Sequence, residues 1–244
     1  MTKMTGQSQN AVHAYKTRPL IGSLRSTALF YSVMSLSLLM CIRQWGQNDP
    51  WSRLDGFVCL HILVTTLLLI HSLVYFNQVV YRSTEVEREA FGMNYDPKMA
   101  LIGMVLGAAE VIVFLDYGQW HFAPALESSP LRMIGAIVLI IAAVWRIWTD
   151  NYLTRHFSHD LTERELMTQG PYQVIRHPRY AGFLLSKVAL ALLYASIIGW
   201  ALVIGSILLI IRRINREEEH LRQVFGTKYD YYAQRTDRMF PRIY

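Results

Sequence analysis

The chain has 244 residues, of which 52% are hydrophobic and 17% charged, and its formal net charge at pH 7 is +6. Several long stretches are almost free of charge, which excludes an ordinary soluble domain, because a soluble helix of that length would carry a polar stripe. The two cysteines, Cys41 and Cys59, lie in or beside apolar stretches, so a disulfide framework or a cysteine metal site is excluded. We assign the positive charge to loops beside anionic lipid rather than to nucleic acid.

Five apolar stretches follow one another at residues 26–42, 56–76, 99–115, 131–149 and 181–211. A helix of about 20 apolar residues crosses a hydrocarbon core about 30 Å thick. The last stretch is too long for one crossing, and Ser196, Gly199 and Trp200 near its middle indicate two arms, about 178–195 and 199–215, joined by a tight turn. We therefore predict an all-α, polytopic integral membrane protein with about five to six transmembrane helices. These include a C-terminal helical hairpin, which either crosses the membrane twice or lies shallow in it.

The segments between these stretches differ in charge. The first 25 residues are basic and lack the early apolar core of a cleavable signal peptide. The 116–130 loop contains Asp116 and Glu127 but no lysine or arginine, whereas the 150–180 loop and the C-terminal tail are rich in arginine. By the positive-inside rule, both termini are expected in the cytoplasm. The compact length favours a prokaryotic inner membrane.

Ionisable residues inside the apolar stretches are costly unless they are paired or functional, and here they are His61, His71, Glu110 and Lys187. Their roles stay open, although Glu110 and Lys187 could pair. A His-x-x-His pair on a loop, with two nearby acidic residues, is too unspecific to assign a metal. These residues are His156, His159, Asp160 and Glu163.

A compact polar block, GPYQVIRHPRYAG, occupies residues 170–182. Gly170 and Pro171 end whatever precedes them, and Pro178 favours extended backbone at His177. His177 is therefore expected on a turn just before a helix, where free N–H groups and the helix dipole favour an anion. The block either binds a carboxylate or phosphate, or anchors the helix to lipid headgroups.

A second polar block follows one hydrophobic hairpin later, at residues 212–219. Arg213 and Glu217 are four residues apart, so they share a helix face and can pair. Glu217, Glu218 and Glu219 place three like charges beside the membrane, which nearby arginines can neutralise. Helical spacing continues to Gly226, a residue suited to a helix C-terminus, and a second short helix follows. The block is either a solvated charged helix or a negative face that, opposite the first block, binds a ligand with both a cation and a carboxylate.

Together the two blocks, GPYQVIRHPRYAG at 170–182 and RINREEEHLRQVFGTKYDYY at 213–232, resemble the paired signatures of the isoprenylcysteine carboxyl methyltransferase family and of related membrane phospholipid methyltransferases. The resemblance covers about residues 140–244. It implies S-adenosylmethionine as methyl donor, bound at the cytoplasmic face in a pocket shaped by the hairpin and the tail. It also implies Arg213 and Glu217 as catalytic residues. The donor-binding residues that it implies are Gly170, Pro171, Tyr172, Arg176, His177, Tyr180, Gly182, Glu217 and Glu218.

The resemblance divides the chain into two regions. Residues 1–130 are an N-terminal tail and three transmembrane helices on the acceptor and lipid side, and residues 131–244 are a methyltransferase-like core. The expected acceptor is hydrophobic or membrane-embedded: an isoprenylcysteine carboxylate, a lipid, or a small thiol or amine. No nucleic-acid partner is expected, and the oligomeric state is not assigned.

Two alternatives remain. NADPH-dependent membrane reductases of the sterol type resemble this C-terminal half, including a tail near Pro-x-Ile-Tyr, as at 241–244. The chain is short for that group, and GPY followed by REEE fits the methyltransferases better. The third interpretation is a non-enzymatic membrane protein in which both blocks anchor headgroups.

Overall fold

The computed structural model describes residues 55–82, 110–117, 122, 128–156 and 166–241. Within them the chain is helical, with one isolated β-bridge, which confirms the predicted all-α class. The elements are α2 (Gly56–Arg82), α5 (Ser129–His156), the 3-10 helix η4 (Gly170–Gln173), α6 (Pro178–Leu193), α7 (Ile197–Phe225) and α8 (Thr227–Ala233). Residues 110–117 add a short helical stretch. The predictions for residues 26–42, for most of 99–115 and for the loop histidine His159 lie outside the described residues.

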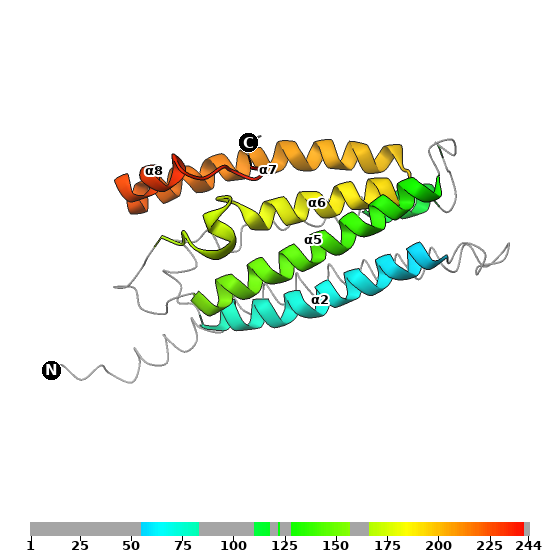
Figure 1. Cartoon of the computed structure of the whole chain (residues 1–244), viewed down its shortest axis with the longest axis horizontal. Coiled ribbons are helices and arrows are strands. Elements are labelled where there is room, and N and C mark those ends of the chain that lie inside the picture. Colours follow the sequence, from blue (N-terminus) through cyan, green and yellow to red (C-terminus); the bar gives the residue numbers. More distant parts are fainter. Residues whose placement is uncertain (1–54, 83–109, 118–121, 123–127, 157–165, 242–244) are drawn as a thin grey trace, which may run out of the picture.

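Four long helices form the described part of the molecule and lie side by side in the order α2, α5, α6, α7 (Figure 1). α5 packs against both α2 and α6, and α6 packs in turn against α7. α8 lies beside the last turns of α7 (Figure 1). We call the end of α6 that carries residues 166–178 the loop end, and the opposite end, where residues 194–196 join α6 to α7, the turn end.

The hairpin predicted from the long apolar stretch is present as α6 and α7. Ser196 ends the turn and caps α7, because its Oγ accepts a hydrogen bond from the Gly199 N–H at 3.1 Å. The second arm is longer than expected, since the charged residues after 211 continue the same helix instead of leaving it. α7 ends at Gly226, whose φ of 53° and N–H bond to the Arg222 carbonyl (2.8 Å) confirm the predicted helix end.

Close contact between helices depends on two glycines. A Cβ atom added at Gly135 would lie 2.9 Å from the Leu193 Cα, and one added at Gly199 would lie 2.8 Å from the Ala191 Cα. Small residues at such points let two helix backbones approach, as is common among membrane helices. The spacings α5–α6 and α6–α7 are therefore set by backbone contacts.

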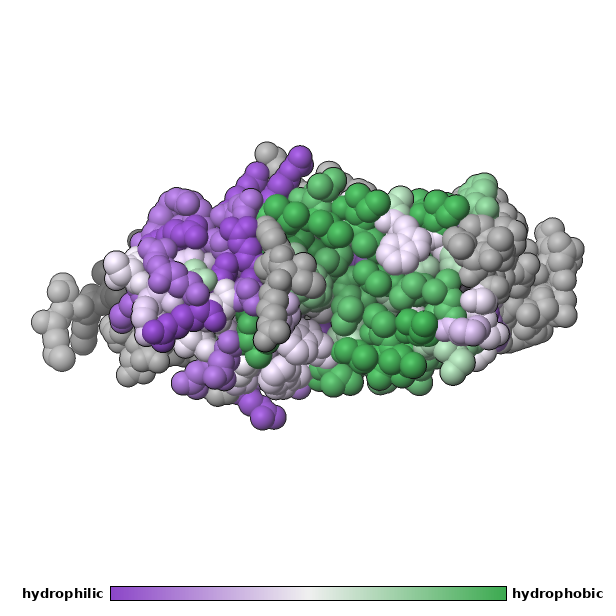
Figure 2. Space-filling model, turned by 45° about the horizontal axis from the view of Figure 1, so that its top comes forward, coloured by the Kyte–Doolittle hydropathy of each residue, from purple (hydrophilic) through white to green (hydrophobic). Residues whose placement is uncertain are grey.

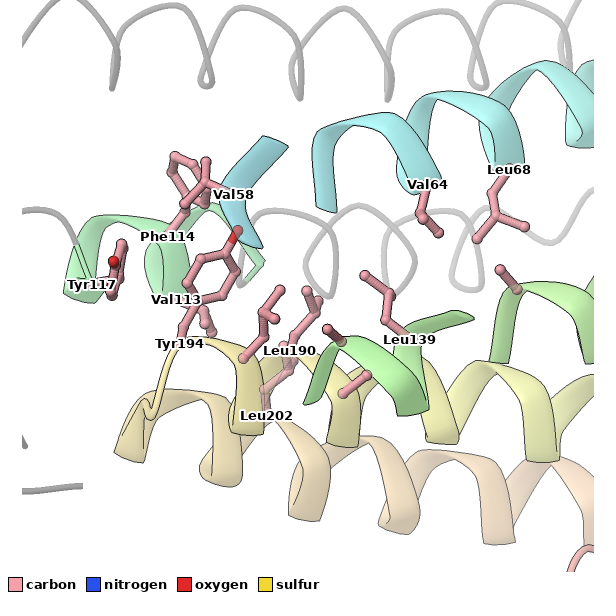
Figure 3. Close-up of a cluster of buried hydrophobic side chains, with 14 residues drawn as sticks. Val58, Val64, Leu68, Val113, Phe114, Tyr117, Leu139, Leu190, Tyr194 and Leu202 are labelled. Atoms are coloured by element: carbon pink, nitrogen blue, oxygen red, sulfur yellow. The ribbon is translucent and has the colours of Figure 1, made fainter. Parts of the chain in front are cut away.

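A cluster of buried apolar side chains joins the helices and the 110–117 stretch (Figure 3). Its labelled members are Val58, Val64, Leu68, Val113, Phe114, Tyr117, Leu139, Leu190, Tyr194 and Leu202 (Figure 3). A second cluster around Leu184, Val203 and Ile214 joins α6 to α7. Because both clusters include α6, this helix is the centre of the packing.

Large apolar side chains also cover the outside of the layer. On the face in Figure 2 they form a continuous band, while hydrophilic residues gather at the loop end. Those more than half exposed include Leu63, Leu67, Ile70, Val74, Ile134, Ile137, Ile141, Val144, Ile204 and Leu208. So much exposed apolar surface is typical of a protein in contact with lipid. Among the described residues, α5 and α7 are long and apolar enough to cross a membrane.

The ionisable residues of the apolar stretches have partners. Lys187 on α6 forms an ion pair with Glu110, as the sequence allowed but could not assign. His61 Nδ1 lies 2.6 Å from the Tyr194 hydroxyl, and His71 Nε2 lies 3.1 Å from Asn151 Oδ1. These contacts join helices that are distant in sequence, so they stabilise the packing inside the apolar region.

A second set of polar contacts closes the turn end. Asp55 caps α2, since its Oδ1 accepts hydrogen bonds from two backbone N–H groups of the first turn at 3.0 Å. Its other oxygen lies 2.6 Å from the guanidinium of Arg132, which also donates to the Leu193 carbonyl at 3.1 Å. Asp116 accepts a hydrogen bond from the Ser196 hydroxyl. The turn end is thus held by side chains that bind helix ends.

Candidate active site

The loop before α6 has the backbone that its glycine and prolines predict. Gly170 has a φ of 60°, and an added Cβ would collide with the Tyr152 ring, so no larger residue fits there. Pro171 is buried in η4. His177 is the residue before α6, which confirms its predicted position, although its ψ of 59° lies short of the extended region.

Two N–H groups of this loop, just before the start of α6, are bonded within the chain. The Arg176 N–H donates to the Asp237 carbonyl at 2.8 Å, and the His177 N–H donates to the Arg238 carbonyl at 2.9 Å. Ile175 and Asp237 form the isolated β-bridge. The chain's own C-terminal segment, which we define as residues 233–239, therefore pairs with the loop just before α6.

Glu218 is the centre of a buried ionic cluster. Its side chain is 1% exposed. Oε1 lies 3.0 Å from Arg176 Nε and 3.3 Å from His177 Nε2, and Oε2 lies 3.0 Å from Arg238 Nη2. The exposed Arg222 is farther away, at 3.9 Å. Such a buried carboxylate is stable only because several donors surround it.

Further bonds join the same elements. Arg176 Nη1 donates to the Ala233 carbonyl at 2.8 Å and to the carbonyl of Thr236. The Tyr232 hydroxyl donates to the Tyr172 carbonyl at 2.6 Å, and burial is the main reason that the pKa of Tyr232 rises to about 12. Burial, followed by the nearby carboxylate of Glu218, likewise raises the pKa of Tyr229. Both phenols therefore stay protonated at neutral pH.

A second group lies beside the cluster and joins α6 to α7. The Tyr180 hydroxyl donates to Glu217 Oε2 at 2.8 Å and accepts a hydrogen bond from Arg213 Nε. Helical spacing allowed Arg213 and Glu217 to pair, and in the structure the Tyr180 hydroxyl connects them. The Tyr180 and His177 rings are 5.8 Å apart, so the group adjoins the Glu218 cluster. The two polar blocks of the sequence thus meet at the loop end.

Gly182 lies apart from this group. An added Cβ would sit 3.1 Å from Trp145 Cδ1, so Gly182 faces α5, whereas Tyr180 faces α7. The structure brings Arg176, His177, Tyr180, Arg213, Glu217 and Glu218 together. It places Gly170, Pro171 and Tyr172 on the loop beside them, and Gly182 on the opposite face of α6.

A pocket of about 430 Å³ opens beside the Glu218 cluster. It is lined by Arg176 and by residues 233–238 of the C-terminal segment. Its walls carry three arginines and one aspartate, so the pocket is polar and largely cationic. The pocket therefore lies between the loop and the C-terminal segment.

Sequence reasoning missed the residues that support the loop from outside the two blocks. Trp145 Nε1 donates to the Pro178 carbonyl at 2.9 Å, and the buried Asp150 accepts from Arg179 Nε at 3.0 Å. No sequence pattern indicated a role for Arg238, because it lies after the second block. Trp145 and Trp148 lie near the end of the 131–149 stretch, but tryptophans at the headgroup level are typical of many membrane helices and do not indicate a site.

Comparison with known proteins identifies the family of this chain. The model of the phospholipid methyltransferase family matches residues 129–228. The protein-S-isoprenylcysteine O-methyltransferase B of Arabidopsis thaliana is 32% identical over 163 residues, which are 56% of this chain and 82% of the relative. The chain belongs to the isoprenylcysteine carboxyl methyltransferase family. A protein-S-isoprenylcysteine O-methyltransferase of Dictyostelium discoideum is 27% identical over 192 residues, 75% of this chain and 77% of the relative.

A relative with a different name is also similar. The nickel-cobalt-cadmium resistance protein NccN of Alcaligenes xylosoxydans is 29% identical over 140 residues, 57% of this chain and 62% of the relative. Membership in the isoprenylcysteine carboxyl methyltransferase family makes this chain a membrane methyltransferase. The matched family model includes the loop, the hairpin and all of α7, and it ends before the C-terminal segment.

Proposed function

We propose that this methyltransferase uses S-adenosylmethionine as its donor and methylates a hydrophobic or membrane-embedded acceptor. The observation that carries the proposal is the group Tyr180, Arg213 and Glu217 at the loop end. This group lies where the apolar part of the hairpin meets its charged part, beside a polar pocket. A lipid-soluble acceptor and a water-soluble donor can meet only at such a boundary.

The residues present at the loop end fit this donor. S-adenosylmethionine carries a sulfonium, an ammonium and a carboxylate. Glu217 makes one hydrogen bond within the described part of the chain, through Oε2, so its Oε1 can accept from an ammonium or a hydroxyl. Tyrosine rings favour cations through their faces, and arginines suit carboxylates. The tyrosines at this end include Tyr172, Tyr180, Tyr229 and Tyr232.

The proposed donor-binding residues divide into two sets by their contacts. Tyr172, Tyr180 and Glu217 would contact the donor directly. Gly170 and Pro171 shape the loop, and Gly182 lets α6 approach α5. Arg176 lines the pocket, and His177 and Glu218 would support it from behind, because the polar atoms of all three already bind one another and the C-terminal segment.

Arg213 and Glu217 are the proposed catalytic residues. A bound sulfonium donor supplies an activated methyl group, and transfer is an in-line displacement in which positioning accounts for much of the rate. Arg213 would orient a carboxylate acceptor by a charge-assisted hydrogen bond. With an amine or thiol acceptor, Glu217 would take up or steer the proton instead. Tyr180 holds both side chains in place in either case.

We also propose how the chain is arranged around the site. The loop end would face the cytoplasm with both termini, in a multi-pass protein of a prokaryotic inner membrane, as the arginine distribution favours. Residues 1–130 would form the acceptor and lipid side, and residues 131–244 the catalytic core. The contact between Glu110 and Lys187 joins the two regions inside the apolar layer.

Isothermal titration of detergent-solubilised protein with S-adenosylhomocysteine tests the proposal. We expect saturable binding by the wild type and a loss of at least about tenfold in Glu217→Ala, as for a hydrogen bond to a charged group. Glu219→Ala is the matched control, because Glu219 is exposed in the same run of glutamates and contacts Gln223. We expect its affinity to match the wild type.

Two outcomes would contradict the proposal. A folded wild-type protein that binds no S-adenosylhomocysteine is not this kind of methyltransferase, and binding of NADPH instead would favour the reductase alternative. Equal losses in Glu217→Ala and Glu219→Ala would place the donor elsewhere.

A further inference from the structure

The C-terminal segment is attached to the loop by backbone and side-chain contacts together. Its carbonyls at Asp237 and Arg238 accept from the loop N–H groups at 2.8 and 2.9 Å. Met239 is 3% exposed and packs in the apolar cluster with Ile175 and Ile214. The segment therefore lies over the loop as an ordered part of the fold and forms most of the pocket wall.

One side chain of this segment reaches the ionic cluster. Arg238 Nη2 lies 3.0 Å from Glu218 Oε2, whereas Arg176 and His177 bind Oε1 of the same carboxylate. Glu218 thus uses one oxygen for the loop and the other for the C-terminal segment. Glu217, the residue before it on α7, belongs to the proposed catalytic group.

We propose that Arg238 is a positioning residue for methyl-donor binding: by bridging to Glu218, it holds the C-terminal segment against the loop and so keeps the pocket wall in place. The inference rests on the proposed donor and adds a residue outside both sequence blocks. Arg238 acts through Glu218 and the segment, and it is not placed in contact with the reacting atoms.

The ionic contact between Arg238 and Glu218 joins a side chain of the C-terminal segment to the cluster. Without Arg238, Glu218 keeps Arg176 and His177 on the other oxygen, so α7 and the loop remain joined. The segment would retain its backbone pairing with the loop, the Arg176 bonds to the Ala233 and Thr236 carbonyls, and the Met239 contact. The helices should therefore stay folded while the pocket wall opens more often.

The experiment compares Arg238→Ala with Arg238→Lys and Arg222→Ala in detergent-solubilised full-length protein. Lysine keeps the charge and can restore one contact to Glu218. Arg222 is the matched control, since it approaches the same Glu218 oxygen at 3.9 Å from α7 and does not line the pocket. Two quantities are measured: the Kd for S-adenosylhomocysteine, and the hydrogen exchange of peptides spanning the loop in protein without ligand.

We expect Arg238→Ala to weaken S-adenosylhomocysteine binding by about tenfold or more, as the loss of a charged hydrogen bond predicts. The Arg176 and His177 amides should exchange faster in this variant, because their acceptors lie on the segment. Arg238→Lys should recover most of the affinity, and Arg222→Ala should match the wild type in both quantities.

Unchanged affinity in Arg238→Ala would overturn the inference, whether or not the loop amides exchange faster. Equal losses in Arg238→Ala and Arg222→Ala would also overturn it, since the effect would then come from the total charge around Glu218. If the wild-type protein binds no S-adenosylhomocysteine, the proposed function fails, and the role of Arg238 in donor binding fails with it.

Discussion

The loop end and the turn end of α6 both contain buried charge, yet they use it differently. At the turn end, Arg132 donates to the Leu193 carbonyl and Asp55 accepts from N–H groups of α2. These charges satisfy backbone groups that the helix termini leave unpaired. At the loop end, the Glu218 carboxylate binds side chains from two separate segments, and an adjoining tyrosine connects an arginine to a glutamate.

The buried charges at the turn end serve stability, whereas those at the loop end lie where methyl transfer is proposed. A charge that caps a helix gains from a fixed partner and has no need of a ligand. The half-buried group at the loop end has side chains with capacity for further bonds, and it lies beside a pocket. Substitutions at the turn end should therefore change stability alone, whereas those at the loop end should also change donor binding or turnover.

The largest effect is expected for Glu218→Ala. The change leaves Arg176, His177 and Arg238 without their carboxylate, and breaking a buried ion pair costs about 3–5 kcal/mol. Chemical denaturation in detergent measures the loss of unfolding free energy. The exposed Glu219→Ala should change it by less than about 0.5 kcal/mol. Equal stability of the two variants would show that the Glu218 cluster does not hold the loop.

Two tyrosines, Tyr180 near the start of α6 and Tyr194 just after its end, test the comparison directly. Tyr180→Phe removes the hydroxyl between Arg213 and Glu217, so we expect kcat to fall by about 10- to 100-fold, the worth of a charged hydrogen bond. Tyr194→Phe removes the contact with His61 at the turn end and should destabilise the fold by about 1–3 kcal/mol. Turnover per folded molecule should stay unchanged in Tyr194→Phe. An equal fall in kcat in Tyr194→Phe would show that substitutions at the turn end also change turnover.

Two glycines on the α5–α6 interface extend the comparison to packing. Gly135→Ala would place a Cβ 2.9 Å from the Leu193 Cα, and backbone atoms cannot move aside, so a loss of about 1–3 kcal/mol is expected. Gly182→Ala meets the Trp145 side chain at 3.1 Å, which can adjust, so its loss should be smaller. The melting temperature should therefore fall further in Gly135→Ala than in Gly182→Ala. A weaker affinity for S-adenosylhomocysteine in Gly182→Ala, without loss of stability, would instead support donor contact at Gly182.

The sequence predicted the features that depend on local pattern. The α6–α7 hairpin follows from one long apolar stretch with small residues at its centre, and the end of α7 follows from Gly226. The partners of Glu218 could not be predicted, since Arg238 lies 20 residues from it and Arg176 lies 42 away, with no periodicity to connect them. The same reason hid the Tyr180 hydroxyl between Arg213 and Glu217. Helical spacing predicts which side chains share a face, and it does not predict what a neighbouring helix inserts between them.

The smallest effect is expected for Asp55→Asn, and it is a change in how the stability of the fold depends on pH. Burial alone would raise the pKa of Asp55, but the Val58 N–H and the Arg132 guanidinium outweigh it and hold the pKa below its usual value. A carboxylate with a lowered folded pKa stabilises the fold above its unfolded pKa of about 3.9, and this contribution is lost as pH falls through the folded value.

Asparagine can still cap α2 through its Oδ1, but its NH2 group replaces the oxygen that accepts from Arg132 and Tyr117, so Asp55→Asn removes the charge and these two contacts. The melting temperature of the variant should therefore be slightly lower at neutral pH and should fall less steeply than that of the wild type below about pH 4. Parallel curves for the two proteins would mean that the Asp55–Arg132 pair does not stabilise the fold. Turnover per folded molecule at neutral pH should be the same in both proteins, because the Asp55–Arg132 contact lies at the turn end, away from the loop end.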